Sequence, residues 1–522
     1  MSSERDDGRF DRRKLFKFGG GAAVALAGAG AVSRWKGGVL NPVSATRADA
    51  NVIPVPPNDI DIFIGGTDGW ISLPASPTIT TAAGVLVHPD SYAPTPTDDP
   101  QLPPGLTTYI FGFRNITGLS NDSQANQKNR AQASAPLFFV DEVAKNDAGL
   151  NPFKVSITNL GLAQRPDLFD AHTLHWHGFR NVIPFFDGEP TGSVSVPAGS
   201  LFTYAYVARD PGTYMYHCHV EDVEHVHMGM TGLVFVHAYQ DLTGVGGGAT
   251  APVARRKGGT AANAPLGYAY NDDVAMSDPK STAFDREFAM FMSEVWAESH
   301  WADAHIQLPE WSDYRPDFEL LNGRVYPDTL APNGVLDTAH NWNGRTPSFI
   351  PVQTDPTTGD LLAAPGNDKL RRQPVSSLVN CNTGDRVLLR FANLGFKEGA
   401  MTMAGIRMRV IGRDATPMRG ESAAPGGGRS ASDSLDISYL TNVVNVGPGE
   451  SYDCLFTAPA FDATAALVAG TDAFGPYNTY VLYNRNYQHS DNLANNDFGG
   501  QATEIRVHAT GVTPQTLPNQ DQ

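Results

Sequence analysis

Cysteine is rare in this chain, which has three in 522 residues: Cys218, Cys381 and Cys454. No two of them stand in a Cys-x-x-Cys spacing, and this argues against a thiolate-rich zinc site. Cys381 and Cys454 lie in strand-like runs and could pair in an oxidising compartment. The sequence does not fix the distance between them, so that disulfide stays open.

Charged residues are also few, at 18% of the chain, whereas Gly and Pro number 52 and 38. This composition favours strands and turns over helices. Basic residues are in deficit, with 38 Lys and Arg against 55 Asp and Glu and a net charge of −17. Such a charge argues against nucleic acid or an anionic membrane as a partner and is compatible with a small cationic substrate.

Long apolar runs are absent beyond the N-terminus, so we expect no membrane anchor in the mature protein. Near the start, Arg12 and Arg13 precede a Gly- and Ala-rich run from Phe18 to Val32, which is too short and small-sided to span a bilayer stably. The pattern predicts a cleavable twin-arginine export signal with a cleavage site at Ala48-Asp49-Ala50. We therefore expect a periplasmic or extracellular protein.

Short alternating runs separated by turn signals predict an all-β chain built from antiparallel sandwiches. A stretch rich in Gly, Ala, Thr and Asp divides two strand-rich blocks. Within the first block, Gln124 to Ser134 is polar and is predicted to be a surface loop. The expected segments are an export signal (1–50), a first sandwich domain (51–239), a linker (240–283), a second sandwich domain (284–511) and a tail (512–522).

The two strand-rich blocks look like copies of one another. Residues 154–161 match 386–395, and residues 194–204 match 444–452. The run that ends in His217-Cys218-His219 aligns with residues 480–486, where the second block has Asn-Arg-Asn. The methionines of residues 401–408 replace a His-rich strand and are interpreted as core filling. We expect the second block to keep the scaffold without metal ligands.

Seven of the 14 histidines and one cysteine lie between residues 172 and 230. Without a metal, imidazoles this dense would crowd polar donors for no packing gain. In a strand, His175 and His177 leave the same face, and so do His217 and His219, while Cys218 leaves the opposite face. One strand can therefore serve two sites.

Two imidazoles, a thiolate and a weak axial thioether are the ligand set of a blue, type 1 copper site. Cys218 supplies the sulfur, and Met230 is the candidate axial ligand. His172 and a histidine downstream of Cys218 supply the nitrogens.

The run His172-x-x-His175-x-His177-Gly178, followed by His217-Cys218-His219 and a downstream His-x4-Met, resembles the copper motifs of the multicopper oxidase family. The resemblance implies two cupredoxin-like Greek-key β-sandwich domains with copper ligands only in the first. It also implies the following ligands: type 1 copper at His172, Cys218 and His225 with Met230 axial, type 2 copper at His175, and type 3 copper at His177, His217 and His219.

The resemblance further implies an exported oxidoreductase. A type 1 copper would take one electron at a time from a small reductant, either a metal ion or a phenol or amine. Cys218 and its neighbours His217 and His219 would be the catalytic residues that pass the electron to a copper cluster, where dioxygen is reduced to water.

The segment after Cys218 departs from the family pattern, because six residues rather than four precede His225. We prefer His225 to His227 as the ligand because His225-x4-Met230 keeps the family's His-to-Met spacing. His227 and Met228 are then outer-shell or core residues. The insertion is acidic, and it could bind Fe²⁺ or Mn²⁺, orient an imidazole, or be a solvated loop: Glu221, Asp222 and Glu224.

A complete cluster in this family uses eight histidines, and this chain supplies four. The histidines outside residues 172–230 contain no His-x-His pair, and His300 and His305 are interpreted as part of a surface loop. A twofold axis presents every residue twice, so two copies face to face would supply eight. We therefore expect a homodimer, or a multiple of one, with the type 2 and type 3 coppers shared between chains.

Two other functions stay open. A nitrite-reductase-like enzyme would hold a single type 2 copper near His175 and His217, although that family typically lacks the second histidine after the cysteine. A type 1 electron carrier or copper-binding protein would need no cluster.

Overall fold

The computed structural model describes residues 31–36, 39–44, 62–74, 107–142, 153–180, 182–243, 264–271, 274–307, 309–335, 348–349, 353–355, 359–418, 436–465, 469–486 and 499–520. Strands β1 (Ala31–Lys36) and β2 (Val39–Ser44) pair antiparallel within one unit, residues 1–54. All later elements belong to a second unit, residues 55–522. The predicted arginine pair and cleavage site lie outside the described residues. Among those described, no helix is long and apolar enough to cross a membrane.

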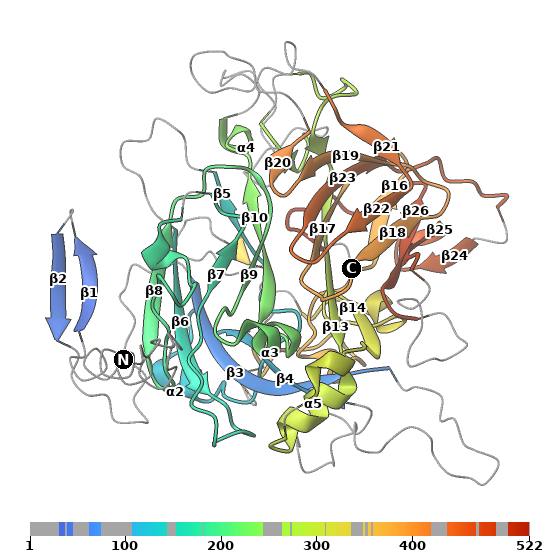
Figure 1. The fold of residues 1–522 in the computed structure, drawn as a ribbon. Helices are drawn as coiled ribbons and strands as arrows, with labels where there is room; N and C mark the ends of the chain where they lie inside the picture. The colour runs from blue at the N-terminus through green and yellow to red at the C-terminus, as the bar shows by residue number, and fades with distance from the viewer. Residues whose placement is uncertain are drawn as a thin grey trace, which may run out of the picture. The chain divides into compact units, whose positions relative to one another are not determined.

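The first sandwich contains two sheets (Figure 1). One has the order β4-β3-β6-β8: β4 (Thr107–Asn115), β3 (Ile62–Ser72), β6 (Phe153–Gly161) and β8 (Leu201–Tyr206). The other has the order β15-β5-β10-β9-β7: β15 (Ser348–Phe349), β5 (Phe138–Asp141), β10 (Thr231–His237), β9 (Gly212–His217) and β7 (His175–His177).

The second sandwich also contains two sheets. One is ordered β14-β13-β17-β23-β19-β20, with β21 beside β19: β14 (Phe318–Leu321), β13 (Arg286–Val295), β17 (Arg386–Asn393), β23 (Ser451–Thr457), β19 (Met408–Arg413), β20 (Thr416–Pro417) and β21 (Tyr439–Thr441). The other is ordered β16-β26-β25-β18-β22, with β24 beside β25: β16 (Val379–Asn382), β26 (Ala502–His508), β25 (Gly475–Asn484), β18 (Gly399–Met403), β22 (Val443–Val446) and β24 (Ala469–Asp472).

The two sandwiches share one topology. In each, a parallel pair (β3 with β6, or β13 with β17) is followed by an antiparallel neighbour (β8 or β23). In each, a second parallel pair (β5 with β10, or β16 with β26) continues antiparallel into β9 and β7, or into β25 and β18. The all-β prediction with two sandwich domains is confirmed, and the four sequence matches between the blocks fall on equivalent strands.

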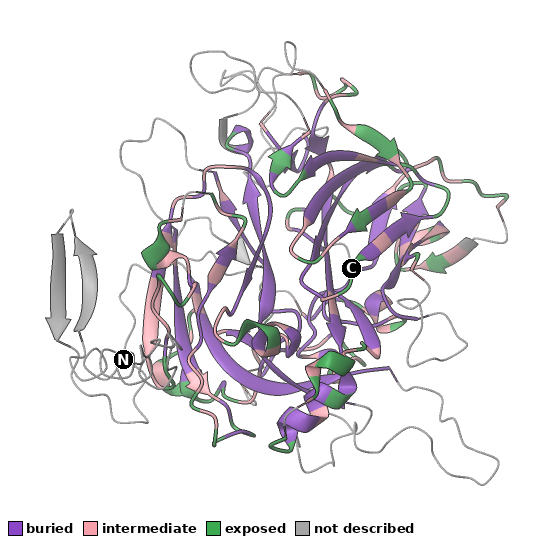
Figure 2. Cartoon of the chain, viewed as in Figure 1, coloured by how far each residue is buried: buried purple, intermediate pink, exposed green. Residues whose placement is uncertain are grey.

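Helices and short strands fill the connections. The short pieces are β11 (Gly267–Tyr268), β12 (Ala283–Phe284), α2 (Asn121–Ala125), α3 (Asp222–His227), α4 (Gln240–Thr243), α5 (Ala297–Ala304) and the 3-10 turns η2 (Pro184–Phe186), η5 (Trp311–Asp313), η6 (Asp328–Leu330) and η7 (Asp368–Leu370). The alternation of aromatic and β-branched residues along the strands buries one core in each sandwich (Figure 2).

The sandwiches pack against each other through an apolar layer. Side chains of β5, β9 and β10, including Phe139, Met215 and Phe235, meet Phe291 and Leu394 of the second sandwich. This contact buries large apolar side chains, each contributing on the order of 1.5–3 kcal/mol. The second sheet of the first sandwich, which carries the predicted ligands, is thereby held firmly against its neighbour.

A buried charge network crosses the same contact. Arg390 Nε donates to Glu287 Oε1 at 2.6 Å, and its Nη1 donates to Asp453 Oδ1 at 3.1 Å. The hydroxyl of Thr213, on β9, donates to Asp453 Oδ1 at 2.5 Å. His237 Nε2 lies 3.1 Å from Glu287 Oε2. Because removal of one partner would strand a buried charge, this network fixes the register between the sandwiches.

Three segments differ from the sequence expectation. The end of the predicted linker is packed rather than loose, with Leu266 and Tyr270 buried in a core cluster. The predicted tail lies along β13, where the Gln515 and Asn519 side chains accept from Glu287 N and Ala289 N. Residues 124–134 are only partly a surface loop, because Ala125, Asn126 and Lys128 are exposed whereas residues 131–134 are buried. Their buried members include three glutamines that satisfy backbone groups or Arg114: Gln124, Gln127 and Gln132.

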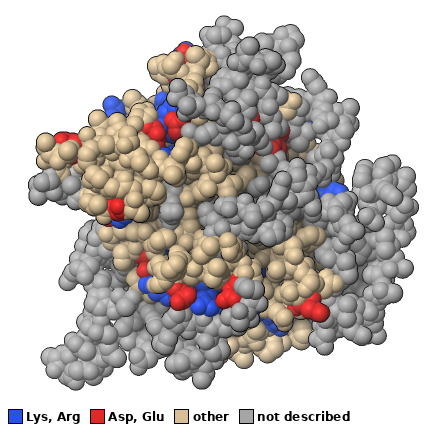
Figure 3. Space-filling view, turned by 180° about the vertical axis from the view of Figure 1, so that it is seen from behind, with Lys and Arg blue, Asp and Glu red and all other residues tan. Residues whose placement is uncertain are grey.

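Cys381 and Cys454 are both buried and are not joined to each other, so the disulfide left open by the sequence is not formed. Cys381 Sγ donates instead to the carbonyl of Arg506 at 3.6 Å. On the face seen in Figure 3, acidic and basic side chains lie beside one another rather than in separate areas.

Candidate metal centre

Three predicted type 1 ligands meet in the core of the first sandwich. Cys218 Sγ lies 3.2 Å from His225 Nδ1 and 4.0 Å from His172 Nδ1, and all three residues are completely buried. The Nε2 atoms of both histidines have no hydrogen-bond partner. Three ligand atoms this close together, in a dry core, match the nitrogen and sulfur donor set that suits copper.

Neighbouring histidines favour the thiolate form of Cys218, which is the form that binds a metal. Burial raises the pKa of the Cys218 thiol, but His225 and His172 outweigh burial and hold that pKa well below its usual range. Burial lowers the pKa of His225, while Cys218 and Asp170 raise it to about 10. The metal-free pair is therefore a thiolate beside an imidazolium, and a thiolate is the form that binds metal.

Met230 closes the same site. Its backbone nitrogen donates to the His225 carbonyl at 2.9 Å, and its carbonyl accepts from Cys218 N at 3.1 Å. Gly66 lies next to both His172 and Met230. A Cβ at this position would be 2.9 Å from His172 Cδ2 and 3.5 Å from Met230 Cε. The absence of a side chain at Gly66 thus leaves the room in which His172 and the Met230 thioether approach each other.

The four remaining histidines that were predicted as ligands gather on the other side of β9. In the register of β7 with β9, His175 lies opposite His217. The ring of His175 is 5.0 Å from that of His217 and 4.9 Å from that of His219, and the rings of His177 and His217 are 5.7 Å apart. Trp176 points the other way into the core, with 1% of its surface exposed. The chain's alternation therefore separates the imidazole cluster from the Cys218 site.

Burial favours the neutral form of three imidazoles in this cluster, those of His175, His177 and His217. It lowers the pKa of His217 to about 3 and lowers the pKa of His175 and His177 as well. Neutral imidazole is the form that coordinates a metal. Two of the rings are also oriented: His175 Nδ1 donates to the Asp187 carbonyl at 2.8 Å, and His217 Nδ1 donates to the Cys218 carbonyl at 2.8 Å.

The cluster lies at an edge of its sheet. Strand β7 is the terminal strand in the order β15-β5-β10-β9-β7, and the His175 side chain is 18% exposed. The second sandwich approaches the cluster at His177. A Cβ on its residue Gly449 would come within 3.2 Å of His177 Nε2. In the equivalent place of the second sandwich, Met401 pairs with Asn484, so neither residue of that pair is an imidazole.

Thr173 connects the two sites. Its hydroxyl accepts from His219 N at 2.9 Å, and its backbone nitrogen donates to Cys218 Sγ at 3.5 Å. Sequence reasoning missed this residue, since a threonine between two ligand histidines carries no metal-binding signal of its own.

The acidic insertion forms the short helix α3 rather than a loop. Glu221, with φ of 46°, starts it, and Glu224 is hydrogen-bonded to Asp303 of α5. Burial, and after it the neighbouring carboxyl group of Glu224, raise the pKa of Asp303 to about 8. Glu224 is therefore already engaged within the protein, unlike the exposed Glu221 and Asp222.

Asp170 is a second residue that sequence reasoning missed. Its Oδ2 lies 3.7 Å from His225 Nε2, and the residue groups with Glu221 and His225 as potential metal ligands. The available signal was the Asp170-Ala-His172 spacing, because alternation in an extended chain places residues two apart on the same side.

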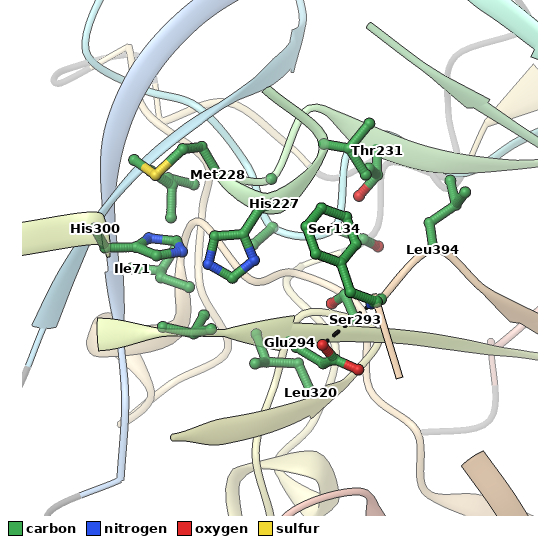
Figure 4. Close-up of a pocket in the computed structure, with 17 residues that line it drawn as sticks. Ile71, Ser134, His227, Met228, Thr231, Ser293, Glu294, His300, Leu320 and Leu394 are labelled. Atoms are coloured by element: carbon green, nitrogen blue, oxygen red, sulfur yellow. Dashed lines mark hydrogen bonds between the residues drawn. The ribbon is translucent and has the colours of Figure 1, made fainter. Parts of the chain in front are cut away.

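His227 lies outside the Cys218 site. It lines a cavity of about 20 Å³ between the sandwiches, where Figure 4 shows its ring beside that of His300. The ring centroids are 4.9 Å apart, and His227 Nε2 accepts from Trp296 N at 3.2 Å. His300 is on α5 and buried, so its interpretation as surface loop was wrong; His305 at the end of α5 is exposed.

This placement predicts different outcomes for two alanine variants. His225→Ala should bleach almost all blue absorption of the copper-loaded protein, because it removes a nitrogen 3.2 Å from the thiolate. His227→Ala should keep the blue band, since its ring bonds to Trp296 N instead. Visible absorption at matched copper content is the measurement. Bleaching by His227→Ala alone would reverse the assignment.

Part of the chain matches a known protein family. Residues 159–241 match the family model described as multicopper oxidase. No curated protein matches the sequence. Among solved structures, a blue copper oxidase from Nitrosomonas europaea is 16% identical, with 85% of each chain covered and a TM-score of 0.44. The multicopper oxidase mgLAC is 19% identical over 86% of this chain and 87% of that one, with a TM-score of 0.46. A copper nitrite reductase from Nitrosomonas europaea is 12% identical over 88% and 96%, with a TM-score of 0.42.

The matched segment contains every predicted ligand, from His172 to Met230. It also contains β7, β9, α3 and β10, the elements that bring those ligands together. Residues 159–241 are therefore similar to the multicopper oxidase family, whose members are copper-dependent oxidoreductases.

Proposed function

We propose that the protein is an exported copper oxidoreductase that takes single electrons from a small reductant and passes them to dioxygen. The observation that carries this proposal is the strand β9 and its continuation. Cys218 faces two imidazoles in the core, while its neighbours His217 and His219 face a second group of imidazoles. Bound copper would supply one-electron redox chemistry at both places.

The predicted ligands form two groups with different roles. His172, Cys218, His225 and Met230 would hold the copper that accepts electrons, in a site from which water is excluded because all four are buried. Cys218 is covalently joined to His217 and His219, so the backbone between them links the two sites directly. The Nδ1 atoms of His175 and His217 donate to the backbone carbonyls of Asp187 and Cys218. This leaves the Nε2 atom of each ring to bind a metal.

Four histidines are half of what a three-copper cluster of this family uses, and two copies would provide the rest. The cluster lies at an open sheet edge among the described strands, with His175 partly exposed. Beside it, the segment that carries Asp187 exposes two large apolar side chains, Ile183 at 56% and Phe185 at 41%. A twofold axis near this edge would bring eight imidazoles together and cover those side chains.

An oxidase consumes dioxygen, a nitrite reductase consumes nitrite, and an electron carrier consumes neither, so the three functions can be distinguished by substrate. Four imidazoles beside the Cys218 site favour dioxygen reduction over a single type 2 copper. Oxygen consumption with a phenol or diamine as reductant tests the proposal. Nitrite turnover without oxygen consumption would indicate the second function, and redox cycling with neither would indicate the third.

One group of residues favours a divalent metal cation as the reducing substrate. Asp170, Glu221 and His225 offer ligand atoms within 4.8 Å of one another, so an ion there would touch a type 1 ligand. The net charge of −17 also favours the approach of cations. Hard oxygen ligands suit Fe²⁺ or Mn²⁺.

This arrangement predicts that Glu221→Gln should slow Fe²⁺ or Mn²⁺ oxidation by about tenfold or more, the scale on which lost supporting groups weaken metal sites. Oxidation of an uncharged organic dye should be little changed. Asp222→Asn is the matched control, because Asp222 is exposed and its Oδ1 only accepts from Val223 N. Equal losses for ion and dye would indicate damage to the Cys218 site instead of a cation site.

A further inference from the structure

Helix α5 follows a strand of the second sandwich, β13, but packs on the first sandwich (Figure 1). Its last residue, Ala304, is buried in the core of the first sandwich. His300 Nδ1 donates to the carbonyl of Tyr109, on β4, at 2.5 Å. At the start of the helix, Trp296 N donates to Nε2 of His227, the last residue of α3, at 3.2 Å. Helix α5 is therefore held against α3, the helix that carries a predicted copper ligand.

Arg165 joins α5 to the chain segment that precedes His172. Its Nη1 donates to the backbone carbonyl of Asp303, on α5, at 2.7 Å and lies 3.5 Å from Asp303 Oδ1. Its Nε and Nη2 donate to the two carboxylate oxygens of Asp167, each at 3.0 Å. The side chains of Arg165 and Asp303 are 6% and 2% exposed, so the loss of either would leave a buried charge without its partner. This double attachment depends on the planar fork of an arginine.

Both partners of the Arg165–Asp303 ion pair lead to the same histidine. In the segment that Arg165 holds, Asp170 places its Oδ2 3.7 Å from His225 Nε2. The Asp303 carboxyl group is hydrogen-bonded to Glu224, the residue before His225 on α3. The ion pair thus connects the two chain segments that meet at the cation site proposed above.

The positive charge of Arg165 is needed for this arrangement. The carboxyl groups of Asp303 and Glu224 lie together, and their negative charges repel each other. Arg165 acts on Asp303 in the opposite sense and offsets that repulsion. Without the guanidinium group, α3 would be driven away from α5, and the segment at 165–170 would lose its attachment to both helices.

We propose that Arg165 and Asp303 are positioning residues for the reducing cation. By joining the segment at 165–170 to α3, they bring together the three ligands of the cation site: Asp170, Glu221 and His225. The inference rests on the proposed oxidation of a metal ion and names the residues that assemble its binding site. Neither Arg165 nor Asp303 is a ligand, so the pair sets the affinity for the cation rather than the rate of electron transfer from it.

The test is the binding of Mn²⁺ to the copper-loaded protein, reduced and kept under argon so that the bound copper cannot oxidise the ion. The EPR signal of unbound Mn²⁺ then gives the dissociation constant. Arg165→Met should raise this constant by about tenfold or more, the scale on which lost supporting groups weaken metal sites. In air, the same variant should raise the KM for Mn²⁺ by a similar factor, with kcat and the oxidation of an uncharged organic dye little changed.

Asp317→Ala is the matched control. Asp317 Oδ2 accepts from the backbone nitrogen of Ala297, the first residue of α5, at 2.9 Å. Its removal weakens the same helix at the other end and leaves the Arg165–Asp303 ion pair in place. This variant should unfold at a lower temperature and bind Mn²⁺ as the wild type does.

If Arg165→Met does not fold, Arg165→Lys takes its place, because it keeps the charge without the paired N–H groups and should weaken Mn²⁺ binding to a smaller degree. An unchanged dissociation constant in the arginine variant, or an equal loss in Asp317→Ala, would overturn the positioning role. A wild type that binds no Mn²⁺ would overturn it together with the cation site. A wild type that binds Mn²⁺ without oxidising it would refute only the proposed reaction, and the binding comparison would still decide the role of Arg165.

Discussion

Cys218→Ser should remove the blue absorption of the copper-loaded protein and reduce oxidase turnover by at least about 100-fold, since changes to groups that merely support a metal ligand already cost 10–100-fold. The serine keeps the size of the side chain but not the thiolate that His172 and His225 stabilise. The imidazole cluster on the other face of β9 should still bind copper, because its rings lie against one another whereas Cys218 Sγ faces His172 and His225.

The chain offers a matched control for this change. Cys381→Ser places the same substitution in the core of the second sandwich, where the hydroxyl can still donate to the Arg506 carbonyl. That variant should keep both colour and turnover. A blue band that survives in Cys218→Ser would remove the sulfur assignment, whatever the activity does.

Dioxygen reduction should depend on the association of two chains. If each chain supplies four of eight imidazoles, dilution below the dimer dissociation constant should abolish oxygen consumption per chain. The blue band should be unchanged, because its ligands all come from one chain and are buried. The measurement is oxygen consumption and visible absorption across a dilution series, with mass determined at each concentration by light scattering.

Ile183→Lys provides a second route to the same result. Ile183 is 56% exposed and lies near Asp187, which orients His175. A charge there should weaken pairing of the copies and shift the loss of oxygen consumption to higher protein concentration. Ile306→Lys is the control, since Ile306 is 64% exposed at the end of α5. A fully active monomer would exclude the shared cluster.

The parts of the site that sequence could predict are those governed by strand alternation. Two-residue periodicity placed His175 and His177 on one face and Trp176 on the other, and it separated Cys218 from its histidine neighbours. Equivalent strands in the two blocks were also visible, because hydrophobic alternation persists after ligands are replaced, as at Met401 and Asn484.

Contacts between distant segments could not be predicted in this way. The approach of Gly449 to His177 and the bond from Glu224 to Asp303 depend on how the sandwiches and α5 pack. Composition was misleading where polar residues are buried. Gln127 is in a polar run that reads as a surface loop, yet it is needed by the buried Arg114. The tail was likewise missed because Gln515 and Asn519 bond to backbone groups rather than pack by apolar periodicity.

Copper content per chain, measured together with the visible spectrum of the fully loaded protein, tests the central claim most directly. One type 1 copper per chain and three cluster coppers per pair predict about 2.5 coppers per chain and an intense blue band. About one copper per chain with the same band would indicate an electron carrier, and about two would indicate separate type 1 and type 2 sites. A fully loaded protein without a blue band would contradict the assignment of copper to His172, Cys218 and His225.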